Sequence, residues 1–175
     1  LGDVYKRQII KVAEGYKLGV QAVNPNCDVY TAYTGSTEDV QKSKEAAQAM
    51  IDKGVDLIGG GGNASNAGMI KACEEAGVYA FGELEQQNLA PETVIFCNMN
   101  NIENLVLQAV KDTIDGDFQG CIREYGIAAD VAQLTEYNSH VPQEVKDKLA
   151  ECMDQMRSGE LDIPMITEIS DDIIH

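Results

Sequence analysis

The sequence predicts an α/β protein with a Rossmann-like, doubly wound parallel sheet. Short apolar runs alternate with amphipathic helical segments along most of its 175 residues. Continuous apolar strands are typical of parallel sheets, which lose water on both faces, and alternation of strand with helix is typical of α/β layers. With 44% hydrophobic and 24% charged residues, the chain has the composition of a folded globular protein.

Five segments have the apolar spacing of amphipathic helices. Asn24 and Pro25 stop the first of them, whereas Gly54 and Gly77 stand where left-handed C-caps are expected after the second and third. Pro142 opens the last one, because a proline at a helix start loses no hydrogen bond. The helices are predicted at 9–23, 38–53, 66–76, 102–114 and 142–156.

Five segments between these helices are rich in β-branched, aromatic and apolar residues, and each is predicted to be a strand. They are residues 27–33, 55–58, 78–82, 94–97 and 121–125. The carboxyl ends of parallel strands meet at one edge of a sheet, where open α/β sheets bind ligands. Polar residues that follow these strands are therefore candidate binding residues.

The sharpest local feature is the run from Gly59 to Gly62, followed by Asn63. Without Cβ atoms the backbone can approach a ligand closely, and N–H groups near a helix start can bind oxygen atoms. The alternative interpretation is a tight turn that requires positive φ. The run does not match the dinucleotide motif GxGxxG, because Ala64 and Ser65 stand where its third glycine is needed.

The loops after the other strands add hydroxyl, amide and carboxylate groups, which suit a polar neutral or cationic solute. The alternative is that each of these residues is an ordinary solvated loop residue. The predicted ligand-binding residues are Gly35, Ser36, Gly61, Gly62, Asn63, Glu83, Glu85 and Asn100.

The net charge of −16 argues against nucleic acid as a partner, because such binding depends on cationic contacts to phosphates. The apolar runs are far shorter than the ~20 residues of a membrane-spanning helix. His140 and His175 have no nucleophile motif nearby, so no catalytic residue is predicted. No cofactor is predicted either.

The cysteines form no CxxC pair or metal-ligand pattern, so no metal or redox site is predicted. We expect them to be buried free thiols that pack as small hydrophobic residues. They are Cys27, Cys73, Cys97, Cys121 and Cys152.

Six segments in a fixed order resemble the basic membrane protein (BMP) family, the substrate-binding lipoproteins of ABC transporters, whose members include purine-nucleoside binders. The segments are EGYKLGVQAVNP (14–25), AYTGSTEDVQKSKEAAQAM (32–50), KGVDLIGGGGNASNAG (53–68), EEAGVYAFG (74–82), KDTIDGDFQG (111–120) and VPQEVKDKLAECMDQMRSGELDIP (141–164). The resemblance implies a type I periplasmic-binding-protein fold, in which two lobes close on a solute. It also implies a non-enzymatic protein with an ABC permease and ATPase as partners, lipid-anchored outside the cytoplasm.

The resemblance assigns residues 9–92 to the C-terminal lobe, 93–120 to a crossing segment with an N-terminal-lobe helix, and 121–175 to a return strand, terminal helix and tail. Residues 1–8, LGDVYKRQ, stand where a buried strand is expected and resemble translated sequencing-adapter sequence. We therefore expect a non-native leader on a chain without most of the N-terminal lobe, the signal peptide and its lipid anchor.

Three positions depart from the nucleoside binders of this family. Leu84 stands where an Asp is expected to hold the ribose hydroxyls, unless Glu83 or Glu85 substitutes for it. Asn100 replaces a usual Lys, and Thr37 replaces a frequent aromatic residue. The expected solute is a nucleoside or a related polar molecule. The alternatives are a ligand-sensing domain of a regulator and a nucleotide-dependent Rossmann enzyme that uses the glycine loop.

Overall fold

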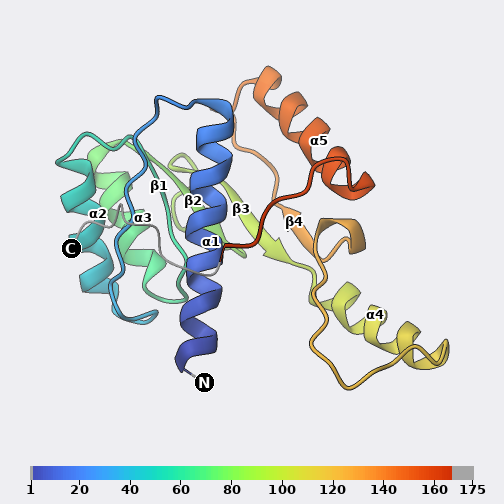
Figure 1. The fold of residues 1–175 in the computed structure, drawn as a ribbon. Coiled ribbons are helices and arrows are strands. Elements are labelled where there is room, and N and C mark those ends of the chain that lie inside the picture. The colour runs from blue at the N-terminus through green and yellow to red at the C-terminus, as the bar shows by residue number, and fades with distance from the viewer. Residues whose placement is uncertain (1, 167–175) are drawn as a thin grey trace. The chain divides into compact units, whose positions relative to one another are not determined.

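The computed structural model describes residues 2–166, and their side chains from residue 9 onward. The chain divides into two units, residues 1–78 with 163–175 and residues 79–162. Figure 1 labels their helices and strands. The first unit contains α1 (Gly2–Val23), α2 (Val40–Ile51), β1 (Leu57–Gly59) and α3 (Asn66–Ala76). The second contains β2 (Tyr79–Glu83), η1 (Gln86–Leu89), β3 (Val94–Asn100), α4 (Ile102–Ile114), η2 (Ile127–Ala129), β4 (Ala132–Leu134) and α5 (Gln143–Ser158).

The core of the first unit is built where α2 packs against α3. A Cβ on Gly68 would lie 2.0 Å from the carbonyl oxygen of Val40, so only glycine allows the two helices to approach this closely. Ala47 of α2 is buried here, as are Met69, Ile70, Ala72 and Cys73 of α3. An ion pair of 2.7 Å between Lys44 and Glu75 joins the helices outside this core.

The second unit contains a mixed sheet. Strand β2 pairs parallel with β3, and β3 pairs antiparallel with β4. The rings of Phe81 and Phe96 stack across the parallel pair with centroids 4.9 Å apart, while Ala80, Val94 and Cys97 are fully buried. The α/β class that the sequence predicts is confirmed.

Two predicted strands are wrong. Residues 27–33 contain only an isolated bridge at Thr31, and residues 121–125 are irregular. The side chain of Ile122 is 94% exposed, and Arg123 forms an ion pair with Asp112 of α4. Strand preference expresses how well a residue fits a half-buried pleated surface, and neither segment provides one. The strand that follows β3 in the chain and pairs with it in antiparallel orientation is β4, not residues 121–125.

The helices follow the prediction closely, and α3 and α4 have the predicted bounds. Gly77 closes α3 in the left-handed conformation, as expected, with φ 71°. The first helix begins at Gly2 and not at Ile9, because an existing helix gains one hydrogen bond per added residue and Lys6, Arg7 and Gln8 are good helix formers. The last part of the predicted tail, residues 167–175, lies outside the described residues.

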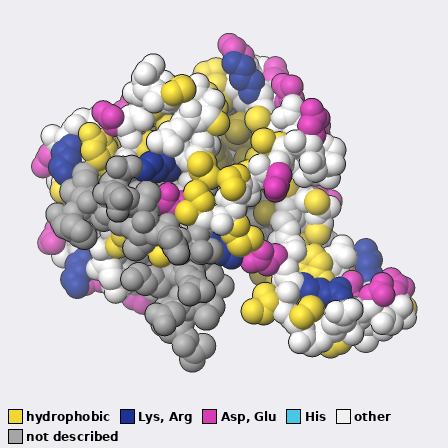
Figure 2. All heavy atoms as spheres, in the orientation of Figure 1, with side chains coloured by type: hydrophobic (Ala, Val, Ile, Leu, Met, Phe, Trp, Pro, Cys, Tyr) yellow, Lys and Arg dark blue, Asp and Glu magenta, His cyan; other side chains and the backbone are white. Residues whose placement is uncertain are grey.

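No helix in the described part of the chain is long and apolar enough to cross a membrane. Acidic side chains are scattered over the face drawn in Figure 2, with basic ones among them.

Candidate functional site

The first group of predicted binding residues lies before α2. The Oγ of Ser36 accepts hydrogen bonds from the backbone N–H groups of Glu38 (3.2 Å) and Asp39 (3.1 Å), and Asp39 in turn caps α2 by accepting from Lys42 N–H at 3.0 Å. Gly35 has φ +72°, which favours glycine. The turn holds the Ser36 oxygen in place and leaves its O–H able to donate to a ligand.

The glycine run precedes α3 in the same unit. None of its four glycines has positive φ, so the expectation that a turn here requires positive φ is wrong. Gly60 and Gly62 are instead needed for space, because a Cβ there would lie 2.4 Å from Asn66 Oδ1 and 2.3 Å from Ser65 Oγ, respectively. At Gly61 the nearest atom, Cδ1 of Ile9, would be 4.0 Å away, so this glycine leaves room beside the backbone.

The two loops of the first unit lie side by side. The backbone N–H of Ser65 donates to the carbonyl of Thr37 at 3.0 Å, and the Asn63 amide donates to the Glu38 carboxylate at 3.2 Å. The structure therefore places the loop that contains Gly35 and Ser36 beside the loop that contains Gly61, Gly62 and Asn63. The second loop follows β1, as the strand-end argument expects, whereas no strand among the described residues precedes the first. Both loops lead into helix starts, where backbone N–H groups lack intrahelical partners.

The second group of predicted residues lies in the second unit. Glu83 ends β2 and stands opposite Asn98 of β3 in the parallel register. Glu85 is exposed and precedes η1, and Asn100 is the exposed last residue of β3. Glu83 and Asn100 thus lie at the carboxyl ends of neighbouring strands, with Glu85 in the turn that follows. The two groups of predicted residues belong to different units of the chain.

Glu83 has a distinct electrostatic environment. Burial raises the pKa of its carboxyl group, because a half-buried carboxylate loses part of its hydration. A raised folded-state pKa means that folding favours the protonated form, so the charged form costs stability at neutral pH. A ligand that donates hydrogen bonds to this carboxylate would replace part of the hydration that it loses on folding.

The sequence places Asn98, Asn100 and Asn101 together at this strand end, and only Asn100 of the three is among the predicted ligand-binding residues. In the register, Asn98 is the direct neighbour of Glu83, whereas Asn100 lies two residues beyond it and pairs with Ala132 of β4. The alternation of side chains along a strand places Asn98 and Asn100 on one face. Asn101 is used differently, because its side chain caps α4 by accepting from Asn104 N–H at 3.0 Å.

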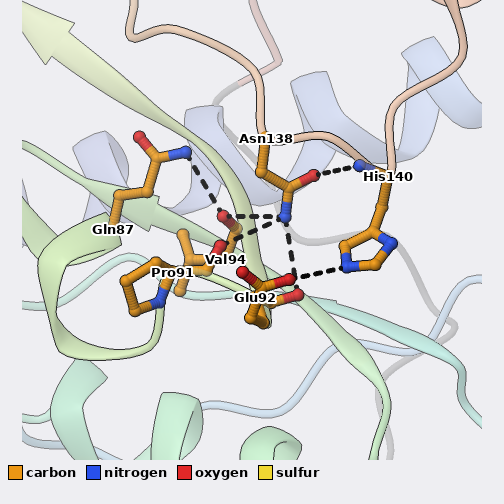
Figure 3. Close-up of polar contacts among 6 residues, drawn as sticks. All are labelled: Gln87, Pro91, Glu92, Val94, Asn138 and His140. Atoms are coloured by element: carbon orange, nitrogen blue, oxygen red, sulfur yellow. Dashed lines mark hydrogen bonds and ion pairs between the residues drawn. The ribbon is translucent and has the colours of Figure 1, made fainter.

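A second polar cluster fastens the segment before α5 to the start of β3 (Figure 3). The Asn138 amide lies 3.3 Å from the carbonyl oxygen of Pro91 and 3.5 Å from those of Glu92 and Val94. Its Oδ1 accepts from His140 N–H at 3.0 Å, and the His140 ring meets the Glu92 carboxylate at 3.0 Å. This cluster, called the Asn138 clamp below, is a structural contact between backbone segments.

The cysteines are only partly as expected. Cys73 and Cys97 are buried, whereas Cys27 and Cys121 are exposed and Cys152 is half-buried. The prediction of uniform burial is therefore wrong, because Cys27 and Cys121 lie in the two segments that form no strand. Among the described residues, no cluster of His, Cys, Asp and Glu could hold a metal ion.

Thiol reactivity should separate these cysteines. Burial raises the pKa of the Cys73 thiol to about 11, and it also raises the pKa of Cys97. Because the thiolate is the reactive form, Cys27 and Cys121 should react with Ellman's reagent at pH 8 in the folded protein, while Cys73 and Cys97 should react only after unfolding. Mass spectrometry of partially labelled protein identifies the sites; equally fast labelling of Cys73 and Cys27 would contradict this burial pattern.

The comparisons with known proteins agree with the fold. Residues 4–167 match the family model described as ABC transporter substrate-binding protein PnrA-like. The chain belongs to this family. The Brucella abortus relative named purine-binding protein BAB2_0673 is 26% identical over 162 residues, which cover 92% of the chain and 45% of the relative. The Bacillus subtilis transcriptional activator protein med is 23% identical over 150 residues, covering 85% of the chain and 47% of that protein.

A solved structure of an ABC transporter solute-binding protein from Conexibacter woesei superposes on this family member with a TM-score of 0.74 at 21% identity, covering 91% of the chain and 54% of that protein. This match confirms the predicted binding-protein fold. The chain spans about half the length of the curated relatives it matches.

Proposed function

We propose that the protein is the solute-binding component of an ABC importer and binds a small polar solute without chemical turnover. The observation that supports this proposal most strongly is the match of residues 4–167 to the PnrA-like substrate-binding family. The candidate binding groups agree with it, because they are hydroxyl, amide, carboxylate and backbone N–H groups at strand ends and helix starts. Such groups hydrogen-bond a neutral polar solute well.

A purine nucleoside is the solute class that we propose. The name of the Brucella relative supports a purine ligand for this family. Glu83 supplies a half-buried acceptor at the end of β2, next to Asn98, which can both donate and accept. We propose that Glu83 takes the place of the Asp that Leu84 replaces, because Glu85 is exposed and Leu84 is 54% exposed. Vicinal ribose hydroxyls would donate to the Glu83 carboxylate.

We further propose that residues 93–120 contribute to a second lobe of a longer protein. No residue of α4 is buried. An apolar groove of about 350 Å³ runs along this helix and is lined by Val106, Ala109, Val110, Thr113, Ile114 and Phe118. An amphipathic helix normally buries its apolar face against another element. The permease, the ATPase and lipid anchoring outside the cytoplasm also belong to this proposal, on the family's precedent.

Binding without turnover can be measured with the 175-residue chain. Guanosine and adenosine are titrated by calorimetry and thermal unfolding, with D-glucose and NAD⁺ as comparison solutes. A native-state ligand at 100 times its Kd raises the free energy of unfolding by about 2.7 kcal/mol, so the melting temperature should rise with the nucleosides. Chromatography should recover the nucleoside unchanged. Conversion of the nucleoside, or a shift with NAD⁺ alone, would contradict the proposal.

Glu83→Gln should separate stability from binding. Removing a half-buried charge should increase the free energy of unfolding at pH 7 by less than about 1 kcal/mol. This gain should disappear as the pH falls through the carboxyl pKa, because wild-type Glu83 is then neutral as well. The same variant should lose nucleoside affinity, because a carboxylate accepts hydrogen bonds more strongly than an amide. Urea titrations at several pH values and calorimetry measure the two effects.

Glu85→Gln is the matched control, because Glu85 is exposed two residues away. It should change neither stability nor affinity by more than about 0.5 kcal/mol. Equal effects of the two substitutions would show that the position of Glu83 at the strand end has no special role.

The second candidate function is a ligand-sensing domain of a regulator, which the similarity to the Bacillus subtilis transcriptional activator favours. The same lobe can serve transport or sensing, since fold does not determine function. Sequencing the gene upstream of the codon for Ile9 distinguishes the two. A lipoprotein signal supports the importer, whereas a helix-turn-helix coding region supports the regulator.

A further inference from the structure

The turn that follows Glu83 is held in an uncommon backbone conformation. Leu84 has φ 55°, in the left-handed region that residues other than glycine rarely adopt. Its backbone N–H donates to the carbonyl of Asn98 at 2.8 Å and so completes the pairing of Glu83 with Asn98, and the chain turns at Leu84, directly after β2. A strained residue of this kind persists only where neighbouring contacts hold it.

Two glutamines of η1 provide such contacts. The Oε1 of Gln86 accepts from the backbone N–H of Glu83 at 3.0 Å and closes the turn locally. Gln87 reaches further, because its amide group donates to the carbonyl oxygen of Glu136 at 3.1 Å. The same amide donates to the carbonyl oxygen of Val94 at 3.4 Å (Figure 3). Its oxygen accepts from the Thr135 hydroxyl at 3.2 Å.

The Gln87 contacts connect the turn to both strands of the antiparallel pair. Thr135 follows β4, and its hydroxyl oxygen also accepts from the backbone N–H of Cys97 in β3 at 2.8 Å. The Gln87 amide thus uses both hydrogens and its oxygen on three separate partners. Neither a carboxylate nor an apolar side chain of the same length can make this set of bonds.

We propose that Gln87 is the positioning residue that fixes the Glu83 carboxylate for ligand binding, by fastening the Leu84 turn to the segment after β4. Gln87 acts through Glu83 and does not itself contact the solute. This inference rests on the proposed function as far as affinity is concerned, but the positioning itself can be tested without any ligand.

The ligand-free test is amide hydrogen exchange in Gln87→Met, which keeps the side-chain length and removes the hydrogen bonds. The Glu83 and Leu84 amides should exchange about tenfold faster than in the wild type, while amides of α3 in the first unit should keep their rates. Gln119→Met, at an exposed glutamine in the loop after α4, is the matched control and should leave both sets unchanged. Wild-type exchange rates at Glu83 and Leu84 in Gln87→Met would overturn the proposal.

The binding test is a double-mutant cycle with guanosine as the probe. Gln87→Met should weaken guanosine binding about tenfold in the wild-type background and less than about twofold when Glu83 is already Gln, because residues that act as one unit are not additive. Equal losses in both backgrounds would reduce Gln87 to a general structural role and overturn the proposal. If the wild type binds neither guanosine nor adenosine, the proposed function fails, and the exchange rates alone decide the role of Gln87.

Discussion

Gly68→Ala should destabilise the protein by about 3 kcal/mol, at the upper end of the cost of overpacking. The added methyl group would lie 2.0 Å from the carbonyl oxygen of Val40 and 3.0 Å from the backbone N of Lys44. Both atoms belong to the backbone, so no side-chain rotation relieves the clash, and α2 must move away from α3. Because Met69, Ile70 and Cys73 are buried beside this contact, the movement would also loosen the core.

Urea unfolding followed by circular dichroism measures this loss. Gly19→Ala is the matched control, because Gly19 lies within α1 and a Cβ there meets no atom within 4 Å. It should stabilise the protein by about 0.5 to 1 kcal/mol through helix propensity alone. A Gly68→Ala midpoint equal to that of the wild type would show that α2 and α3 do not pack as closely as described here.

Asn138→Ala should destabilise the protein by about 2 to 3 kcal/mol, because it removes the centre of the Asn138 clamp. The carbonyl groups of Pro91, Glu92 and Val94 lose a shared donor, and the His140 backbone N–H loses its acceptor. The Val94 carbonyl keeps the Gln87 amide as a donor, so the cost falls mainly on the other groups of the clamp. The clamp joins residues more than 40 positions apart, and its loss should release the segment that leads into α5.

Thermal and urea unfolding, with hydrogen exchange in α5, measure this effect. Asn138→Asp retains an acceptor for His140 N–H but replaces the amide donor with a carboxylate that faces three carbonyl oxygens. This variant should therefore be no more stable than Asn138→Ala. Asn88→Ala, at an exposed asparagine in η1, should change stability by less than about 0.5 kcal/mol. If Asn138→Ala matches Asn88→Ala in stability, the clamp does not hold the segment.

The sequence predicted the helices well because their signals are local. Gly77 and Pro142 mark helix ends by their backbone chemistry, and α3 and α4 begin and end where apolar spacing indicated. The predictions of strands at 27–33 and 121–125 were wrong, because residues that favour β structure form a strand only beside a neighbouring strand. No local sequence pattern reveals whether such a neighbour is present. Strand β4 is only three residues long, too short for a periodic pattern to indicate a strand.

The candidate site was predictable to the extent that it depends on strand ends. Glu83 ends β2 in the second unit and the loop at Asn63 follows β1 in the first, as the parallel-sheet argument predicts. The loop at Ser36 is adjacent to Asn63 although no strand precedes it in the described part of the chain, so that argument does not explain its position. The role of Asn98 depends on the strand register, which sequence alone does not fix. The Gln87 contacts and the Asn138 clamp depend on residues that are distant in sequence and become neighbours only in the fold.

The position of the bound solute tests the central claim most directly. Amide chemical shifts of the isotopically labelled chain are recorded by NMR with and without saturating guanosine. The largest changes should fall on the turn at 83–87 and on the neighbouring Asn98, and Glu83→Gln should reduce them at the same guanosine concentration. Changes confined to other surfaces, such as α4 or α5, or no change at millimolar guanosine, would contradict nucleoside binding at the strand ends.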